Sequence, residues 1–237
     1  MTFESISKLN YLRMICAPRV LSGAAWGVAM ACALPMLAVA LAAVTSGTDT
    51  IVHLASTVLG RYSINTVFLI LLVSVGTFAV GVGAAWLVTM THFKGVKFFE
   101  ITLVLPLAFP AYVLAYAYTS VLDHPGIVQS TLRNVMDWGP RDYWFPEIRS
   151  LGGAALMLVL VLYPYVYLLA RASFIQQSGS AFMTARGLGA SPLAAFLTVS
   201  LPLARPAIAA GVLLAVMETI ADFGTVAYFG VQTFATG

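Results

Sequence analysis

Charged residues are scarce in this chain. Of its 237 residues, 9% are charged, whereas soluble domains usually carry about 25%. Apolar residues make up 60%, so there are too few charges to solvate a globular surface. This composition excludes a cytosolic enzyme, a secreted domain and an intrinsically disordered chain. Two cysteines are also too few for a disulfide framework. The sequence therefore predicts an integral membrane protein.

Catalytic motifs are missing as well. The sequence contains no Gly-x-x-x-x-Gly-Lys-Ser/Thr phosphate loop, so we expect no ATP site in this chain. His53, His92 and His124 lie in predicted loops and are spaced too far apart to indicate a metal site. No nucleophile–base pair is recognisable. We therefore expect no enzymatic activity, no bound cofactor or metal, and no nucleic-acid partner.

Long apolar runs are what the sequence does contain. A helix that crosses a bilayer needs about 20 predominantly apolar residues. Five stretches qualify, at about 24–44, 64–90, 101–121, 151–170 and 206–228. They are continuous runs and not the alternating segments of a membrane β-barrel. We expect an all-α, polytopic transmembrane helix bundle with five spans in this chain.

Basic residues are distributed unevenly between the predicted loops. Eight lie in the N-terminal stretch and in the loops at about 91–100 and 171–205. The other four share the opposite loops with five acidic residues. Because cytoplasmic loops are enriched in Lys and Arg, we expect the N-terminus in the cytoplasm.

The chain is predicted to divide near residue 62. Residues 1–62 would hold the cytoplasmic N-terminus, the first span and an outer loop, and residues 63–237 the main transmembrane domain. The first apolar run and its basic flank are too long for a signal peptide, the competing interpretation, so we expect an uncleaved anchor. The chain stops soon after the fifth span, so we expect it to be part of something longer.

The loop before the fifth span, at about 178–203, is apolar but too irregular to span. Ser191 followed by Pro192 is typical of a helix N-cap with proline at the first helical position. Leu193, Phe196 and Leu197 then follow at i, i+3 and i+4. This spacing predicts a short helix with one apolar face.

Two further signals delimit that helix. Gly187 and Gly189 are expected to break the preceding helix at a tight corner. Leu201-Pro202 is expected to end the short helix before the fifth span. The result would be a helix–corner–helix on the cytoplasmic face with an apolar knob. Such a knob suits a groove on a soluble partner, or it packs on its own bundle or on lipid; the pattern leaves both open.

The spacing in this loop resembles the EAA loop of ABC transporter permeases. That motif reads Glu-Ala-Ala, three residues, Gly, nine residues, Ile, one residue, Leu-Pro. Gly189, Leu201 and Pro202 match it, and Val199 stands for the Ile. We refer to residues 178–203 as the EAA-like loop.

The start of the motif departs from the family. Met183 stands at the Glu position and Thr184 at the first Ala position, while Ala185 matches the second. Met183 cannot complete a capping box, so we expect the first helix to start less firmly. The resemblance implies that this loop couples the chain to an ATPase through Met183, Thr184, Ala185, Gly189, Leu193, Phe196, Leu197, Val199, Leu201 and Pro202.

Longer stretches resemble the ferric-iron permeases of this superfamily, at 142–153, 162–171, 217–224 and 228–234. The resemblance implies a type I importer permease in the bacterial inner membrane that works by alternating access. It also implies three partners in addition to membrane lipid: a cytoplasmic ABC ATPase dimer, a periplasmic or extracellular solute-binding protein, and a second permease half, fused or separate.

Polar residues inside the predicted spans are candidates for a translocation path. Glu218 and Asp222 lie four residues apart and would share a helix face. Buried charge in a bilayer usually faces a bundle interior or a water-filled path, although hydration or structural hydrogen bonds near the outer end would also explain the pair. Tyr112 and Tyr116 also share a face, and phenolate suits ferric iron; interfacial packing is the other interpretation.

Other possibilities stay open at this stage. Pro106 and Pro110 in the third span indicate either a broken, path-lining helix or an ordinary kink. The cargo could instead be thiamine or a polyamine. A secondary transporter that relays protons through Glu218 and Asp222, a membrane scaffold and an intramembrane enzyme are the rival functions.

Overall fold

The computed structural model describes residues 22–42, 57–139, 142–177 and 179–236, and these residues contain helices and no strands. The chain separates into two units, Met1–Val58 and Leu59–Gly237. In the first unit a single described helix, Ser22–Ala42, is long and apolar enough to cross a membrane, and all of its residues are exposed. It corresponds to the first predicted span, whose last two residues lie outside the described ones.

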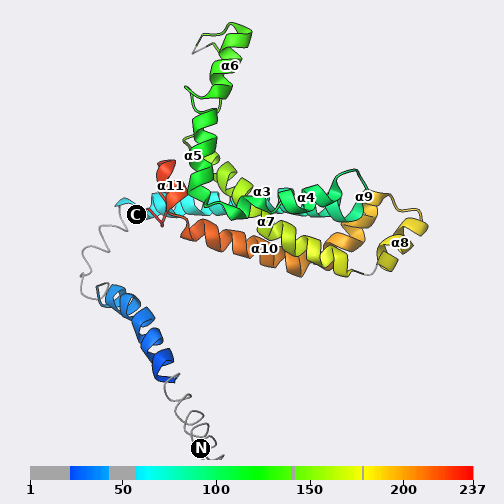
Figure 1. Ribbon diagram of the computed structural model, residues 1–237, viewed down its shortest axis with the longest axis horizontal. Helices are drawn as coiled ribbons and strands as arrows, with labels where there is room; N and C mark the ends of the chain where they lie inside the picture. The colour runs from blue at the N-terminus through cyan, green and yellow to red at the C-terminus, as the bar shows by residue number, and fades with distance from the viewer. Residues whose placement is uncertain (1–21, 43–56, 140–141, 178, 237) are drawn as a thin grey trace, which may run out of the picture. The chain divides into compact units, whose positions relative to one another are not determined.

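Three long helices form the body of the second unit. They are α3 (Leu59–Met90), α7 (Leu151–Gln176) and α10 (Leu201–Ala221), and they pack side by side (Figure 1). Helix α7 contacts both of the others and is the most deeply buried. The predicted spans at 64–90 and 151–170 lie within α3 and α7. The all-α membrane bundle expected from composition is therefore confirmed.

Small residues let these helices approach closely. A Cβ added to Gly81 of α3 would lie 2.9 Å from the carbonyl oxygen of Tyr163 in α7. A Cβ added to Gly211 of α10 would lie 2.8 Å from the Cα atom of Val166. Both neighbouring atoms belong to the backbone, so a side chain at either glycine would force the helices apart.

The third predicted span is not one helix. Helix α4 (Val96–Thr102) and the short 3₁₀ helix η1 (Leu105–Ala108) are followed by α5 (Ala111–Leu122) and α6 (Ile127–Met136), with a bend of 101° between the two pairs. The described residues hold four helices long and apolar enough to cross a membrane, or five if this bent pair is one span. In Figure 1, α5 and α6 rise away from the body of the unit.

The prolines explain the bend. Pro106 lies in the first turn of η1, and Phe109 and Pro110 are extended, with ψ angles of 137° and 139°. Proline lacks an N–H donor and disfavours helical geometry in the residue before it. Two prolines four residues apart thus turn the chain sharply, where an ordinary kink would have kept one continuous span.

The fifth span begins and ends earlier than predicted. Helix α10 continues without a break from α9 (Pro192–Ala195) and a π-helical turn, η2 (Phe196–Ser200), so that Pro192–Ala221 is one apolar helical stretch. The prediction that Leu201-Pro202 ends the short helix is therefore wrong. The Leu201 N–H donates to the carbonyl of Phe196, five residues earlier. This wide turn gives space to the Pro202 ring, which would clash inside a regular α-helix.

The segment after α10 returns to the start of α3. A short helix, α11 (Gly224–Tyr228), precedes a turn with Gly230 at a φ of 67°. The Asn65 side chain then donates to the Gln232 carbonyl at 2.9 Å, and the Phe234 N–H donates to the Thr66 hydroxyl at 3.2 Å. These bonds fix the last described residues against α3.

We predict that Gly81→Ala destabilises the bundle by about 1–3 kcal/mol, because the new methyl group meets the backbone of α7. Gly83→Ala is the matched control, since it lies in the same helix with open space around its Cβ position. It should be neutral or slightly stabilising. Denaturant unfolding of the purified protein in detergent measures both, and equal midpoints for the two variants would contradict the packing argument.

Candidate functional site

A backbone motif shapes the corner of the EAA-like loop. Helix α8 (Gly179–Gly187) ends two residues before Gly189, whose φ is 91°. The Gly189 N–H donates to the Arg186 carbonyl and the Ala190 N–H to the Ala185 carbonyl, each at 3.1 Å. This is the Schellman pattern, in which a left-handed residue ends a helix. The predicted corner is present, and it needs glycine at 189 because other side chains disfavour this φ.

The next helix starts as predicted. The Ser191 hydroxyl accepts a hydrogen bond of 3.2 Å from the Ala194 N–H, and Pro192 occupies the first turn of α9. The Arg186 guanidinium reaches across the corner and donates to the Ala190 carbonyl at 2.8 Å. These bonds hold the two helices of the loop in a defined relation.

The predicted apolar face of the short helix, which the structure divides into α9 and η2, has an exposed part and a buried part. Leu193 and Leu197 are 54% and 50% exposed, but Phe196 is only 7% exposed. The centroid of the Phe196 ring lies 5.0 Å from the centroid of the Trp86 ring in α3 and 5.7 Å from that of the Phe174 ring in α7. Phe196 therefore does not belong to the exposed knob; it fastens the loop to two helices of the bundle. The helical spacing predicts Phe196 on the same face as Leu193 and Leu197. That face lies at the edge of the contact between the loop and helices α3 and α7, so only Phe196 is buried.

The exposed apolar residues come from both helices of the loop and from the corner. We define the apolar knob as Met183, Leu188, Leu193 and Leu197, all of which are at least half exposed. The sequence pattern missed Leu188, because it lies between two glycines and outside any helical period. Thr184 is exposed and Ala185 half-buried, while Val199, Leu201 and Pro202 are half-buried at the base of the loop.

A cavity of about 360 Å³ lies beneath α8. It is lined by residues of the loop and of the ends of α3 and α7, among them Met90, Phe174, Gln177, Phe182, Met183 and Ser200. Gln177 donates to the Ser200 carbonyl at 3.0 Å and so bridges α7 to the π-helical turn. Met183, which stands at the Glu position of the motif, thus faces a mainly apolar space.

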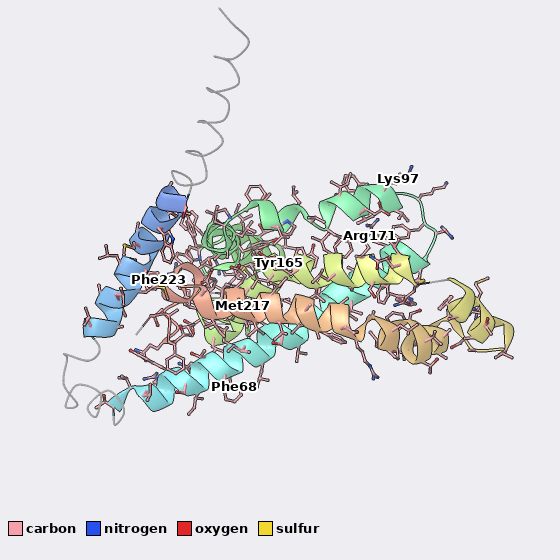
Figure 2. All side chains as sticks on the ribbon, turned by 90° about the horizontal axis from the view of Figure 1, so that it is seen from below. Phe68, Lys97, Tyr165, Arg171, Met217 and Phe223 are labelled. Carbon is pink, nitrogen blue, oxygen red and sulfur yellow. The ribbon has the colours of Figure 1, made fainter. Side chains whose placement is uncertain are left out.

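Basic residues gather at the same end of the unit. Figure 2 shows Lys97 and Arg171 toward the end that carries the EAA-like loop, and Phe223 toward the opposite end. Arg171 of α7 pairs with Glu100 of α4 at 3.0 Å. This distribution agrees with the cytoplasmic placement expected for the loop.

The structure separates Glu218 from Asp222. Helix α10 ends at Ala221, and Asp222 has a ψ of 111°, so the two carboxylates do not share one helix face as predicted. The Asp222 carboxylate accepts hydrogen bonds from the N–H groups of Thr225 and Val226, at 2.8 and 3.3 Å, and from the Thr225 hydroxyl at 3.0 Å. It caps α11. Glu218 is exposed on the last turn of α10.

Both candidate tyrosines lie on α5 against α11. The Tyr116 ring lies 6.1 Å from the Tyr228 ring, and Tyr112 packs beside Gly224, while more than half of each tyrosine side chain is exposed. Tyr112 and Tyr116 thus lie close to the segment that Asp222 caps. In the described part of the chain, no three His, Cys, Asp or Glu side chains are grouped closely enough to hold a metal ion.

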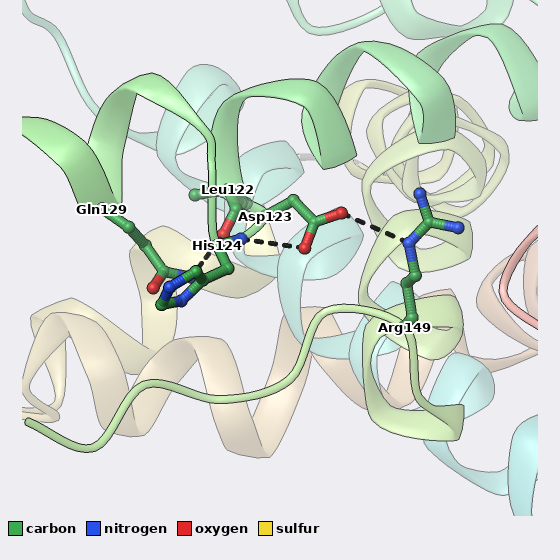
Figure 3. A network of polar contacts seen from close by, with 5 residues as sticks. All are labelled: Leu122, Asp123, His124, Gln129 and Arg149. Atoms are coloured by element: carbon green, nitrogen blue, oxygen red, sulfur yellow. Dashed lines mark hydrogen bonds and ion pairs between the residues drawn. The ribbon is translucent and has the colours of Figure 1, made fainter. Parts of the chain in front are cut away.

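Sequence reasoning missed Arg149, which organises the polar contacts at this end. Its Nε atom lies 3.3 Å from an Asp123 carboxylate oxygen, as Figure 3 shows, and its guanidinium lies 5.2 Å from the centre of the Tyr228 ring. The second Asp123 oxygen accepts from the His124 N–H, and Gln129 donates to the Leu122 carbonyl. The sequence signal that could have pointed to Arg149 is its position just before the long apolar run that begins at Leu151.

Comparison with known proteins identifies the family. The model of the binding-protein-dependent transport system inner membrane component matches residues 78–236. The chain belongs to this family of ABC importer permeases. It is a multi-pass protein of the inner membrane, as the resemblance implied. Such permeases are generally not enzymes themselves; they work with ATPase and solute-binding partners.

Three similar proteins are permeases of different transport systems. It is 28% identical over 172 residues to the Fe(3+)-transport system permease protein FbpB 2 of Haemophilus influenzae, which covers 73% of this chain and 29% of that protein. It is 28% identical over 145 residues to the molybdenum transport system permease protein ModB of the same organism, covering 61% of this chain and 60% of that protein. A putative 2-aminoethylphosphonate transport system permease protein of Salmonella choleraesuis is 25% identical over 171 residues, which cover 71% of this chain and 58% of that protein. The permease chain thus spans less than two thirds of each relative.

We predict different consequences for the two carboxylates. Asp222→Ala removes the oxygen atoms that cap α11 and should destabilise that helix by about 1 kcal/mol. Glu218→Gln is the control, because no hydrogen bond to its exposed carboxylate is present among the described residues. Hydrogen–deuterium exchange at residues 224–228 should rise several-fold in the first variant and stay unchanged in the second. Unchanged exchange in Asp222→Ala would rule out the capping role.

Proposed function

We propose that this permease chain is the membrane subunit of an ATP-driven importer, and that the EAA-like loop receives movement from a cytoplasmic ABC ATPase dimer. ATP hydrolysis belongs to that partner. A solute-binding protein delivers cargo at the opposite end of the unit, and a second permease half, fused or separate, completes the path.

The observation that carries this proposal is the construction of the loop. The apolar knob is exposed, so a soluble partner has a surface to contact. The corner behind it is fixed by the Gly189 backbone bonds, so the knob cannot rotate freely. Phe196 is wedged against Trp86 and Phe174, so displacement of the knob is transmitted to α3 and α7. A loop that merely covered the bundle would need no rigid exposed apolar surface.

The expected effect of loosening the corner follows directly. Gly189→Ala places a side chain at a φ of 91°, which costs about 1 kcal/mol or more, and should shift the knob. We predict that ATP-driven uptake falls several-fold while the ATPase still hydrolyses ATP. Gly187→Ala is the matched control, with open space at its Cβ position and helical geometry. Uptake per ATP in reconstituted vesicles measures the coupling, and equal ratios in both variants would refute the proposal.

We further propose ferric iron as the cargo. The similarity to the Fe(3+)-transport permease covers the largest share of the chain among the relatives described above. Tyr112 and Tyr116, which pack beside α11, and Glu218 in the last turn of α10 also supply oxygen atoms, which suit a hard trivalent ion. The tyrosines lie on α5 and Glu218 lies on α10, so these oxygen atoms do not form one preassembled metal site. An ion that passes through needs only transient contacts with them.

Uptake assays distinguish the cargoes. Cells that depend on the complete transporter should accumulate radioactive ferric iron in an ATP-dependent manner, and the double substitution of Tyr112 and Tyr116 by Phe should lower that uptake several-fold. Because both rings are retained, packing on α11 is kept while the hydroxyl groups are lost. Parallel uptake of molybdate, 2-aminoethylphosphonate, thiamine and a polyamine tests other cargoes. Preference for any of these would replace iron, and uptake that needs a proton gradient but no ATPase would refute the importer itself.

A further inference from the structure

A polar cavity of about 280 Å³ lies at the start of α3, away from the EAA-like loop. Three separate segments build it: the first turns of α3, the N-terminus of α7, and the turn after α11. Its polar lining consists of Arg61, Asn65, Arg149, Ser150 and Gln232. The proposed coupling and cargo residues are not among these.

The lining carries positive charge and no carboxylate. Arg61 has no ion pair with any described residue. Arg149 uses its Nε atom on Asp123, which lies outside the lining, and the guanidinium retains further N–H donors. Three of the four arginines predicted on the outer side are described, and two of them meet in this cavity. Because the predicted outer loops contain few basic residues, the presence of both Arg61 and Arg149 in one cavity favours an anionic ligand.

Backbone dipoles add to that charge. Helix α7 has 26 residues and begins directly at the cavity, since Ser150 is its N-cap and Leu151 also lines the space. The Gly153 and Ala154 N–H groups are satisfied by the Ser150 hydroxyl and carbonyl. For Leu151 and Gly152, the described residues provide no backbone acceptor. Free N–H groups at a helix start stabilise an anion placed near them.

The walls of the cavity are held in place before any ligand arrives. Asn65 donates to the Gln232 carbonyl at 2.9 Å and thereby ties α3 to the last turn. Gly230, at a φ of 67°, directs that turn back over α3. The Arg149 guanidinium is fixed between Asp123 and the Tyr228 ring. A site that is already ordered loses less conformational entropy on binding.

We propose that this cavity binds a small tetrahedral oxyanion of the phosphate or molybdate type, either free or as the headgroup of an anionic lipid. Guanidinium groups present several N–H donors in a plane and match the oxygen atoms of such anions. A cation would meet two positive charges and a helix N-terminus, and a purely apolar ligand would leave the polar lining unpaired. The site goes beyond the proposed transport function and does not depend on which cargo is moved.

Calorimetric titration of molybdate tests the free anion, with the intact transporter in phosphatidylcholine nanodiscs and without ATP. We expect saturable binding that Arg61→Gln weakens about tenfold or more, because a hydrogen-bonded charge is lost. Arg61→Lys should retain part of the affinity. Arg205→Gln is the control, since it removes another exposed arginine, on α10, outside the cavity and the EAA-like loop.

Native mass spectrometry tests the lipid source in nanodiscs that contain phosphatidylglycerol. If the headgroup is the ligand, Arg61→Gln should retain several-fold less phosphatidylglycerol than Arg205→Gln, and molybdate should bind weakly. If neither probe distinguishes these two variants, the site does not exist. Since both measurements omit transport, a failure of ATP-driven uptake would leave them unaffected and would count against the proposed function alone.

Discussion

The close contact of α3 and α10 with α7 is the constraint on which the rest of the structure depends. In lipid there is no hydrophobic driving force for these apolar helices to associate, because lipid tails are as apolar as their side chains. Their packing therefore depends on van der Waals contacts at short range. Gly81 and Gly211 provide that range, because each lies against the backbone of α7. Helix α7 is therefore enclosed by α3 and α10. Because a tightly packed contact has low compressibility, a movement of α3 or α10 is expected to displace α7 as well.

The EAA-like loop is attached to this bundle through the Phe196 ring and through the backbone at the start of α10. Phe196 enters between Trp86 and Phe174, which belong to the two most closely packed helices. The π-helical turn that follows lets the chain continue into α10 despite Pro202. The loop thus touches α3 and α7 through its aromatic ring and α10 through its backbone. We infer that all three long helices respond together when the knob is displaced.

Run length and turn chemistry were enough to predict much of this fold. Apolar runs located α3 and α7, and the glycine corner and the Ser191 cap were readable because each depends on local backbone geometry. Pro106 and Pro110 left a broken helix and an ordinary kink as alternatives, and the angle of 101° could not be predicted because prolines in membrane helices produce bends of different sizes. The end of α10 was misplaced for a similar reason: the apolar run continues past Ala221, but the Asp222 side chain turns back to start α11.

The candidate site was predicted unevenly for physical reasons. Helical spacing put Phe196 with Leu193 and Leu197, but only the packed neighbours show that one of the three is buried. Spacing likewise joined Glu218 to Asp222, yet the Asp222 carboxylate already accepts two backbone N–H groups and the Thr225 hydroxyl, and so has less capacity for a passing ion. Glu218 keeps its carboxylate exposed at the end of the same helix. Of two acids with the same expected cost in a membrane, Glu218 is therefore the stronger candidate for contact with cargo, because no donor or cation among the described residues pairs with its charge.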